Sequence, residues 1–240
     1  MRIYGINPVL EALRARRVTT IRVSPRADER LTVLLRLAEE QGVSIDRVNV
    51  KELDRITRGG SHQGVAAEVE NAAHLSVEDL VVRAKGVPLI VVLDGIEDPH
   101  NVGAILRTVD AAGADGVVRQ SRHAARLDGA AAKASAGAVA HVAVAEVVNI
   151  ARALETLKDA GVWTVGLVGD APTRYDEVDM TLPTAVVVGA EGTGLRRLVR
   201  ERCDWRASIP MHGHVQSLNV SVAAGIALFE AIRQRRAKQT

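Results

Sequence analysis

Residues 89–107 read LIVVLDGIEDPHNVGAILR, a short apolar run followed by a polar loop and the start of an amphipathic segment. The apolar run has no polar alternation, which is typical of a strand buried on both faces of a parallel sheet. After the loop, apolar residues recur at the spacing of one helix face, namely Val102, Ile105, Leu106 and Val109. The stretch therefore predicts a strand, a loop and a helix, the repeating unit of an α/β fold.

Similar apolar runs follow at helix-length intervals, over residues 116–118, 142–144, 163–168, 185–188 and 207–209. This alternation predicts a parallel sheet with helices on both faces. The first seventy-odd residues read as a smaller α/β unit, with strands over 20–23, 43–50 and 65–69 and helices from Asn7-Pro8 and over 29–41. Asn7 would cap the first helix. We expect one domain over residues 1–72, a linker over 73–88 and a second domain over 89–240.

Composition excludes several classes of protein. The 240 residues include five aromatic residues, too few for a platform that stacks successive bases of a single strand. The single Cys203 allows no internal disulfide and no thiolate metal cluster, which fits a cytoplasmic protein without a metal. No apolar run approaches the ~20 residues that cross a bilayer, so we expect no membrane association.

The net charge of +2 says little about partners, although 26 of the 31 basic residues are arginine. Arginine suits phosphate recognition, but a GC-rich genome would also favour it. Three basic clusters occur, and each is either a phosphate-binding surface or a solvated helix face: Arg119, Arg122, Arg126 and Lys133; Arg196, Arg197, Arg200, Arg202 and Arg206; and Arg233, Arg235, Arg236 and Lys238.

Ligands of open parallel sheets bind beyond the carboxyl ends of the strands, which directs attention to three strand-to-helix junctions. In the first, Asn101 is either a helix cap or a ligand-binding residue. Arg107 is either a surface arginine or a partner of Asn101, because a long helical side chain leans toward the helix N-terminus.

The second junction, residues 189–194 (GAEGTG), has three glycines that let backbone approach a ligand. Its order matches neither the dinucleotide fingerprint nor a Walker A loop. Glu191 within this loop would repel phosphate and suits a cationic or hydroxyl-bearing ligand.

The third junction, residues 210–220 (PMHGHVQSLNV), precedes a long last helix. Ser217 would cap this helix and Asn219 would face the loop. The expected buried stripe comprises Leu218, Val222, Ile226 and Phe229. His212 and His214 have no acidic or cysteine partner nearby in the sequence and read as loop residues.

Together the three junctions resemble the three motifs of the SpoU (TrmH-like) RNA ribose 2′-O-methyltransferases of the SPOUT superfamily. Residues 94–107 (DGIEDPHNVGAILR) are similar to motif one, 187–195 (VVGAEGTGL) to motif two and 209–226 (IPMHGHVQSLNVSVAAGI) to motif three, and 133–138 (KASAGA) resembles a further segment. The N-terminal segments YGINPVLEAL (4–13) and HQG (62–64) resemble the L30e-like substrate-binding domain of the family's bacterial 23S rRNA guanosine 2′-O-methyltransferases.

The resemblance implies a trefoil-knotted, S-adenosylmethionine-dependent domain that acts as a homodimer on RNA, with 23S rRNA favoured over tRNA. It implies Asn101 and Arg107 at the reacting hydroxyl, Glu191 and Asn219 in supporting hydrogen bonds, and Ser217 beside the pocket. Cofactor contacts would come from Gly189, Ile209 and Leu218, with Gly169 and Met211. We expect RNA contacts from Arg58, His62, Arg122, Arg126, Lys133 and Arg196.

Three alternatives remain. The same chemistry could act on tRNA or another rRNA position, including those of antibiotic-resistance enzymes. A non-catalytic rRNA-binding protein would not bind S-adenosylmethionine. A nucleotide-dependent oxidoreductase would need the G-x-G-x-x-G turn that this sequence lacks.

Overall fold

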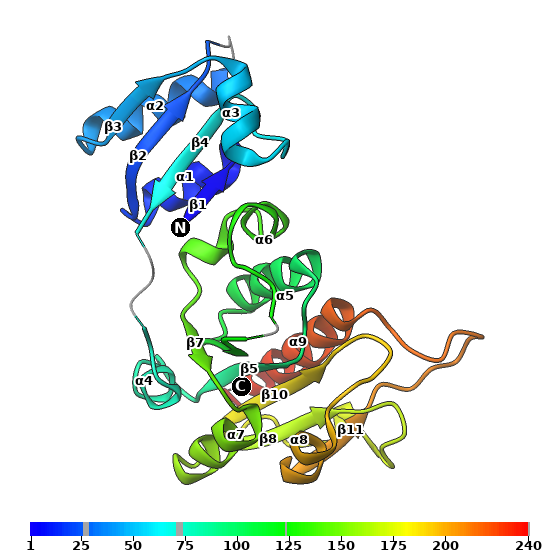
Figure 1. The fold of residues 1–240 in the computed structure, drawn as a ribbon. Coiled ribbons are helices and arrows are strands. Elements are labelled where there is room, and N and C mark those ends of the chain that lie inside the picture. The colour runs from blue at the N-terminus through cyan, green and yellow to red at the C-terminus, as the bar shows by residue number, and fades with distance from the viewer. Residues whose placement is uncertain (26–28, 71–73, 123, 240) are drawn as a thin grey trace.

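The computed structural model describes residues 1–25, 29–70, 74–122 and 124–239, which form two units, each built around its own sheet (Figure 1). The alternation of strands and helices predicted from the apolar runs is confirmed in both units. The domain limits at 72 and 88 stay a prediction, and residues 71–73 lie outside the described residues.

The N-terminal unit has a four-stranded sheet in the order β1-β4-β2-β3. Strand β4 runs antiparallel to β1 and β2, and β3 runs parallel to β2. Its elements are β1 (Arg2–Tyr4), α1 (Ile6–Arg14), β2 (Val18–Val23), α2 (Glu29–Glu40), β3 (Ser44–Arg47), α3 (Val50–Thr57) and β4 (Val65–Val69).

Two sequence-based expectations for this unit are wrong. Helix α1 begins at Ile6, and Gly5 rather than Asn7 is its N-cap. Gly5 adopts a φ of 95°, and the first free amide, that of Ile6, donates to Oε1 of Gln63 at 3.1 Å. A distant side chain therefore caps the helix. The expected strand over 43–50 stops at Arg47, because Asn49 accepts a hydrogen bond from the amide of Glu52 and starts α3.

The C-terminal unit has a seven-stranded, wholly parallel sheet in the order β7-β6-β5-β10-β8-β11-β9. Its elements are α4 (Val77–Val82), β5 (Leu89–Asp94), α5 (Pro99–Ala112), β6 (Gly116–Gln120), α6 (Gly129–Ala134), the 3₁₀ turn η1 (Ala138–Ala140), β7 (Val144–Val147), α7 (Ile150–Asp159), β8 (Trp163–Leu167), β9 (Thr173–Arg174), the 3₁₀ turn η2 (Tyr175–Glu177), β10 (Thr184–Gly189), α8 (Arg197–Arg202), β11 (Trp205–Ser208) and α9 (Val220–Gln239).

Helices cover both faces of this sheet, as predicted. Alternate residues of β5 belong to two different clusters of buried hydrophobic residues, one on each face of the sheet. Val91 is in the cluster that includes residues of α5 and α9. Val92 is in the cluster that includes residues of α4, α7 and α8. All six residues of β5 are buried, which explains why its sequence lacks polar alternation. Within the segment predicted as a linker, α4 contributes the buried Val77 and Leu80 to the second cluster.

The strand order brings the strand-to-helix junctions after β5 and β10 close to each other. From β5 the chain adds β6 and β7 on one side, whereas β10 lies between β5 and β8. Gly189 at the end of β10 is therefore in register with Asp94 at the end of β5. The crevice beyond this reversal is where open α/β sheets bind ligands. The trefoil knot that the resemblance implies stays a prediction.

Helix α9 corrects two further expectations. It begins at Val220, so Ser217 is not its cap, and Asn219 Oδ1 accepts from the amide of Ser221 at 2.9 Å. The expected buried stripe is also wrong, because Val222 and Phe229 are 49% and 52% exposed. The buried face is instead lined mainly by small residues that allow close packing on the neighbouring elements: Val220, Ala224, Ala227, Leu228 and Ala231.

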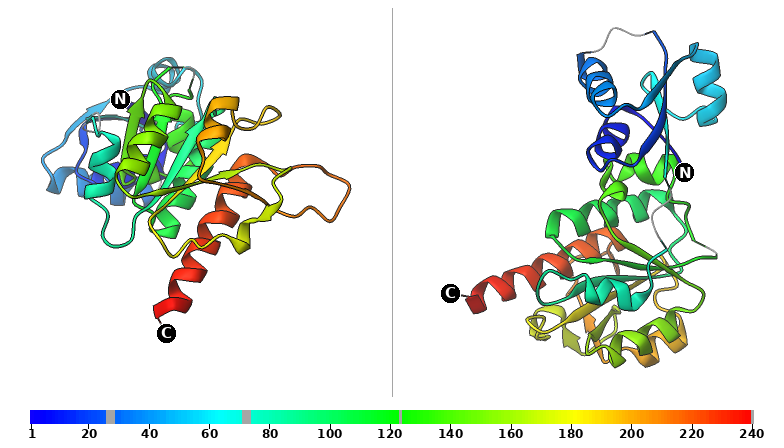
Figure 2. Two further views of the ribbon diagram at one scale, coloured as in Figure 1. Left: turned by 90° about the horizontal axis from the view of Figure 1, so that it is seen from below. Right: turned by 90° about the vertical axis from the view of Figure 1, so that its left-hand side faces the viewer.

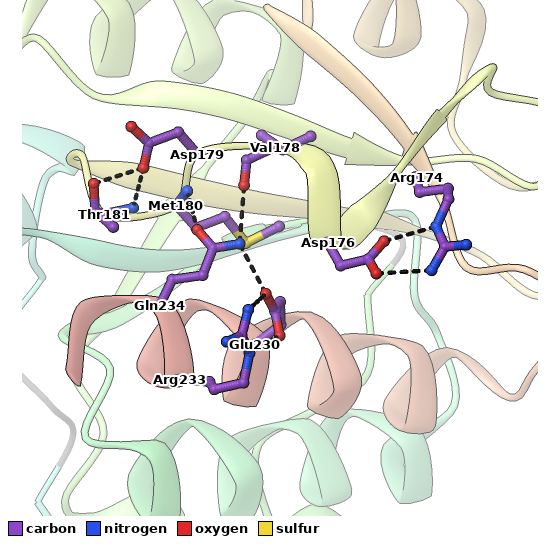
Figure 3. A network of polar contacts seen from close by, with 9 residues as sticks. All are labelled: Arg174, Asp176, Val178, Asp179, Met180, Thr181, Glu230, Arg233 and Gln234. Carbon is purple, nitrogen blue, oxygen red and sulfur yellow. Dashed lines mark hydrogen bonds and ion pairs between the residues drawn. The ribbon is translucent and has the colours of Figure 1, made fainter. Parts of the chain in front are cut away.

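A polar network attaches the C-terminal half of α9 to the segment before β10 (Figure 3). The Gln234 side chain donates to the carbonyl of Val178 at 3.1 Å and accepts from the amide of Met180 at 2.8 Å, as a neighbouring strand would. The nearly buried Glu230 accepts from Gln234 and Arg233, and Arg233 holds the pKa of this carboxyl below its usual range. These bonds fix the helix whose N-terminus carries Asn219.

The two units meet at α6, with the N-terminal unit at one end of the molecule (Figures 1 and 2). The ring of Tyr4 lies against Gly60 of its own unit and Gly129 of the other, where an added Cβ at either glycine would collide with it. Arg17 donates to the carbonyl of Ala140 at 3.1 Å, and Lys133 donates to the carbonyl of Ser61 at 3.3 Å. Apolar and polar contacts therefore join the units.

Candidate active site

The site is anchored by an ion pair between the buried Asp94 at the end of β5 and the exposed Arg196 in the segment after β10. Asp94, with a fully buried side chain, accepts from the backbone amide of Arg196 at 2.8 Å and from its Nε at 2.7 Å. A buried carboxylate needs such partners to offset its lost hydration. The pair ties the loop after β10 to the end of β5.

The glycine-rich loop after β10 is a tight turn. The amide of Gly194 donates to the carbonyl of Ala190 at 2.8 Å, and Gly192 and Gly194 both have positive φ, a conformation that favours glycine. At Gly189 an added Cβ would collide with the backbone of Gly194. The glycines thus fold the loop back onto the strand end and leave Glu191 exposed at its tip.

At the first junction, Asp98 is the N-cap of α5 and accepts from the amide of His100 at 3.0 Å. Asn101 is therefore not the helix cap. It lies in the first turn, only 7% exposed, and its side chain is available for a tertiary contact.

Asn219 makes that contact and joins all three junctions. Its Nδ2 donates to Oδ1 of Asn101 at 2.9 Å and to Oε1 of Glu191 at 2.7 Å. Its Oδ1 simultaneously accepts from the amide and hydroxyl of Ser221 at the start of α9. One amide therefore fixes the relative positions of α5, the glycine-rich loop and α9.

A pocket of about 540 Å³ lies beside these residues, at the carboxyl ends of β8, β10 and β11. It is lined by all five residues expected to bind a cofactor, Gly169, Gly189, Ile209, Met211 and Leu218, together with Glu191, Ser217 and Asn219. Its size is within the usual range for small-molecule sites. Glu191 is the only charged residue among those that line it.

Arg107 is exposed on α5, and the described residues give its side chain no hydrogen bond or ion pair, including none to Asn101. Ser217 is exposed in the segment between β11 and α9, which extends away from the body of the unit (Figures 1 and 2). The structure thus brings Asn101, Glu191 and Asn219 into contact and leaves Arg107 outside that group.

The residues expected to contact RNA differ in their surroundings. Arg58 and Arg122 are exposed, and Arg126 pairs with Asp128 at 3.0 Å. His62 Nδ1 accepts from the amide of Gly64, so Nε2 carries the proton toward Asp54 at 3.1 Å, and Arg196 is held by Asp94. His62 and Arg196 therefore have structural partners.

Asp94 was not predicted as a site residue, although a lone acidic residue ending an apolar strand is a usable signal. Arg119 was noted only as a member of a basic cluster; it is 5% exposed, and burial lowers the pKa of its guanidinium. Among the described residues, no group of three or more His, Cys, Asp or Glu side chains could hold a metal ion. None of the described helices combines the length and apolarity of a membrane span.

Two family models match this chain. Residues 88–229 match the SpoU rRNA methylase family, and residues 2–75 match the RNA 2′-O ribose methyltransferase substrate-binding family. The chain belongs to the SpoU rRNA methylase family, and its site is that of a methyltransferase.

Individual relatives agree with this assignment. The chain is 44% identical over 244 residues to the 23S rRNA (guanosine-2′-O-)-methyltransferase RlmB of Pseudomonas syringae pv. tomato, covering 99% of this chain and 97% of that protein. It is 47% identical over 240 residues to an uncharacterized tRNA/rRNA methyltransferase of Mycolicibacterium smegmatis, covering 98% and 76%. The crystal structure of the SpoU methyltransferase AviRb from Streptomyces viridochromogenes with AdoMet superposes with a TM-score of 0.83 at 27% identity, covering 99% and 91%.

Proposed function

We propose that this protein transfers a methyl group from S-adenosylmethionine to the ribose 2′-hydroxyl of a guanosine in 23S rRNA. The observation that carries the proposal is the Asn101–Asn219–Glu191 hydrogen-bonded group at the edge of the 540 Å³ pocket. The full-length similarity to RlmB, whose name specifies this reaction, supports the choice of substrate.

The pocket fits the cofactor. Apolar side chains such as Ile209 and Leu218 suit an adenine ring, and the exposed backbone of Gly189 and Gly169 suits polar groups. S-adenosylmethionine supplies, when bound, an electrophilic methyl group on a cationic sulfonium. Glu191 favours that positive charge, and the described residues that line the pocket include no arginine or lysine.

The polar side chains then orient the substrate. We infer that Asn101 and Asn219 provide a fixed array of hydrogen-bonding groups for the ribose, because each is already held by another element. Ser217, which lines the pocket on an exposed segment, would close over a bound ligand.

Arg107 orients the phosphate next to the reacting ribose and stabilises negative charge as it develops on the 2′-oxygen. A guanidinium, with a pKa above ~12, is a poor base at neutral pH, so proton removal falls to another group. The exposure of Arg107, and its lack of partners within the part of the chain that the structure describes, support a role toward RNA.

A homodimer would complete this site. Val222 and Phe229 are exposed on α9 seven residues apart, so they lie on one helix face, and α9 packs along α5, which carries Arg107. We infer that a second copy covers this apolar face and places its RNA-directed groups beside the pocket of the first.

Support for rRNA over tRNA comes from the N-terminal unit, which matches a substrate-binding family, and from the similarity to RlmB, which extends over 99% of this chain. Arg58, Arg122, Arg126 and Lys133 would contribute RNA contacts. A ribosomal RNA substrate and a single reduced cysteine both fit a cytoplasmic location.

Incubation with methyl-labelled S-adenosylmethionine and either unmodified 23S rRNA or unmodified tRNA tests the proposal. We expect label in 23S rRNA alone. Label in tRNA alone would contradict the substrate, and failure to bind S-adenosylmethionine by calorimetry would favour a non-catalytic RNA-binding protein.

A further inference from the structure

A second and larger cleft, of about 920 Å³, lies between the two units, away from the cofactor pocket. One wall comes from β1 and the end of α3, and the other from β6, β7 and the segment before α6. We call it the interdomain cleft. Among the described residues that line it, and leaving His74 aside, the charged side chains are five arginines and two carboxylates: Arg2, Arg17, Arg58, Arg119, Arg126, Asp128 and Glu146.

Four of the five arginines have side-chain partners among the described residues, and Arg119 is one of them. Arg2 pairs with Glu68 at 3.0 Å, Arg17 donates to backbone carbonyls, and Arg126 pairs with Asp128 at 3.0 Å. Arg119 and Arg58 differ from these three, and each has binding capacity that the described residues do not use.

Arg119 stands at the end of β6 with only 5% of its surface exposed. Its Nη2 donates to the carbonyl of Ala125, and its Nε lies 3.7 Å from the partly exposed Glu146. Its Nη1 is buried and has no hydrogen-bond partner among the described residues. Arginine stays protonated in proteins, so a positive charge with an unused donor is held in a poorly solvated wall of the cleft.

Arg58 is the exposed C-cap of α3 and adopts the left-handed conformation, with a φ of 54°. Glycine is the residue that this position favours. No hydrogen bond or ion pair to the described residues engages the Arg58 side chain. Its guanidinium is therefore available at the edge of the cleft.

Three arginines of the second basic cluster, on the C-terminal unit, are paired with carboxylates. Arg197, Arg200 and Arg202 pair with Glu201, Asp170 and Glu155 at 3.0, 2.8 and 3.1 Å. Arg107 and Arg152 of this unit are also exposed without a side-chain partner among the described residues, but neither lines the interdomain cleft. Arg58 and Arg119 differ from them because both line this one cleft.

We propose that the interdomain cleft binds a backbone phosphate of the RNA substrate through Arg119 in its wall and Arg58 at its edge. This inference rests on the proposed function and adds a binding site to it. Guanidinium groups form paired hydrogen bonds with phosphate oxygens. Among the described residues that line the cleft, Tyr4 alone has a Phe, Tyr or Trp ring, and this ring is held between two glycines. The site therefore suits contacts with the RNA backbone and not base stacking. A phosphate held between both units fixes the register of the RNA relative to the cofactor pocket.

The test measures binding of unmodified 23S rRNA to the full chain over a range of salt concentrations. Four proteins are compared: wild type, Arg58→Gln, Arg119→Met and Arg152→Gln. Arg152 is a matched control, because it is exposed on α7 with no side-chain partner among the described residues. Loss of one phosphate contact should lower the slope of log affinity against log salt by about 0.7–0.9.

We expect that reduced slope in Arg58→Gln and in Arg119→Met, an unchanged slope in Arg152→Gln, and unchanged affinity for S-adenosylmethionine in all four proteins. If Arg119→Met fails to fold, the slope measured for Arg58→Gln alone tests the proposal, because replacing the exposed Arg58 side chain should not disturb folding. Phosphate-ethylation interference should show a modified phosphate that blocks binding to wild type but no longer matters for Arg58→Gln.

Wild-type slopes in Arg58→Gln and in folded Arg119→Met would overturn the proposal while leaving the function intact. A wild-type protein that binds neither 23S rRNA nor S-adenosylmethionine would overturn the proposed function itself. The two failures are therefore distinguishable.

Discussion

The side-chain amide of Asn219 donates a hydrogen bond to the side-chain oxygen of Asn101, 118 residues earlier in the chain, at 2.9 Å. The same amide group reaches Glu191, while the Asn219 oxygen caps α9. Asn219 thus has two separable roles, one in helix capping and one in positioning the site.

Asn219→Ser separates these roles, because serine caps a helix but has no amide to reach Asn101 and Glu191. Both Asn219→Ser and Asn219→Ala lose the hydrogen bonds to Asn101 and Glu191, so we expect the serine variant to be more stable than the alanine variant by the capping contribution, about 0.5–2 kcal/mol. Methyl transfer should fall about 100-fold in both, because the reacting groups lose their alignment. Near-normal turnover in Asn219→Ser, measured with denaturant unfolding alongside, would show that capping is the only role of this residue.

Arg107→Lys tests whether methyl transfer needs the planar guanidinium group of Arg107 or only its positive charge. Lysine keeps the charge but cannot bind a phosphate through two parallel hydrogen bonds, so we expect turnover to fall about 10-fold or more. Stability should be unchanged, because the exposed Arg107 has no partner among the described residues. Calorimetry should give the wild-type affinity for S-adenosylmethionine, and near-full turnover would contradict the proposed role.

Gly129→Ala tests the contact between the two units. Alanine favours helix over glycine, but a Cβ here would collide with the Tyr4 ring, which Gly60 holds from the other side. We expect the collision to dominate and to cost about 1–3 kcal/mol in denaturant unfolding. Gly86→Ala is the control, since Gly86 has open space and no positive φ. In a Tyr4→Ala background, Gly129→Ala should cost nothing, and an equal cost in both backgrounds would exclude the steric explanation.

Cys203 should be inert in the folded protein. Burial raises the pKa of this thiol to about 12 from an ordinary 9.0, and its Sγ–H donates to the carbonyl of Val199. At pH 8 the thiolate fraction is then about 1 in 10,000. A disulfide reagent such as Ellman's should react only on unfolding, and rapid stoichiometric reaction with the native protein would contradict the buried placement.

The same shift has a consequence for stability. Because the folded state favours the neutral thiol, its contribution is present below pH 9 and is lost as the pH rises toward about 12. The free energy of unfolding should fall more steeply with pH in wild type than in Cys203→Ala over this range. Equal slopes would show that the thiol ionises equally in both states.

Apolar runs located the central strands, because a strand buried on both faces needs an unbroken apolar sequence, as β5 and β10 show. The run over 142–144 was placed too early, since β7 spans Val144–Val147. Apolar runs could not predict that β10 lies beside β5, since pairing partners leave no local signal. The prediction of which residues of α9 are buried was wrong for a physical reason. Tight packing selects Ala224, Ala227 and Ala231 for the buried face, and the larger Val222 and Phe229 remain exposed.

For the site, too, some features could be predicted from the sequence and others could not. Junction loops could be located because parallel strands bring their carboxyl ends to one edge. The contacts of Asn219 with Asn101 and Glu191, and of Gln63 with Ile6, depend on segments brought together only by the fold. The unused donor of Arg119 also required the structure, because the sequence shows an arginine but not its burial.

The most direct test of the central claim is to map the product on 23S rRNA. After incubation with S-adenosylmethionine and alkaline hydrolysis, mass spectrometry should find one new alkali-resistant dinucleotide that begins with 2′-O-methylguanosine. It should form about 100-fold more slowly when Asn219→Ser replaces the wild-type protein. A methyl group on a base, on a nucleotide other than guanosine, or on tRNA alone would contradict the account.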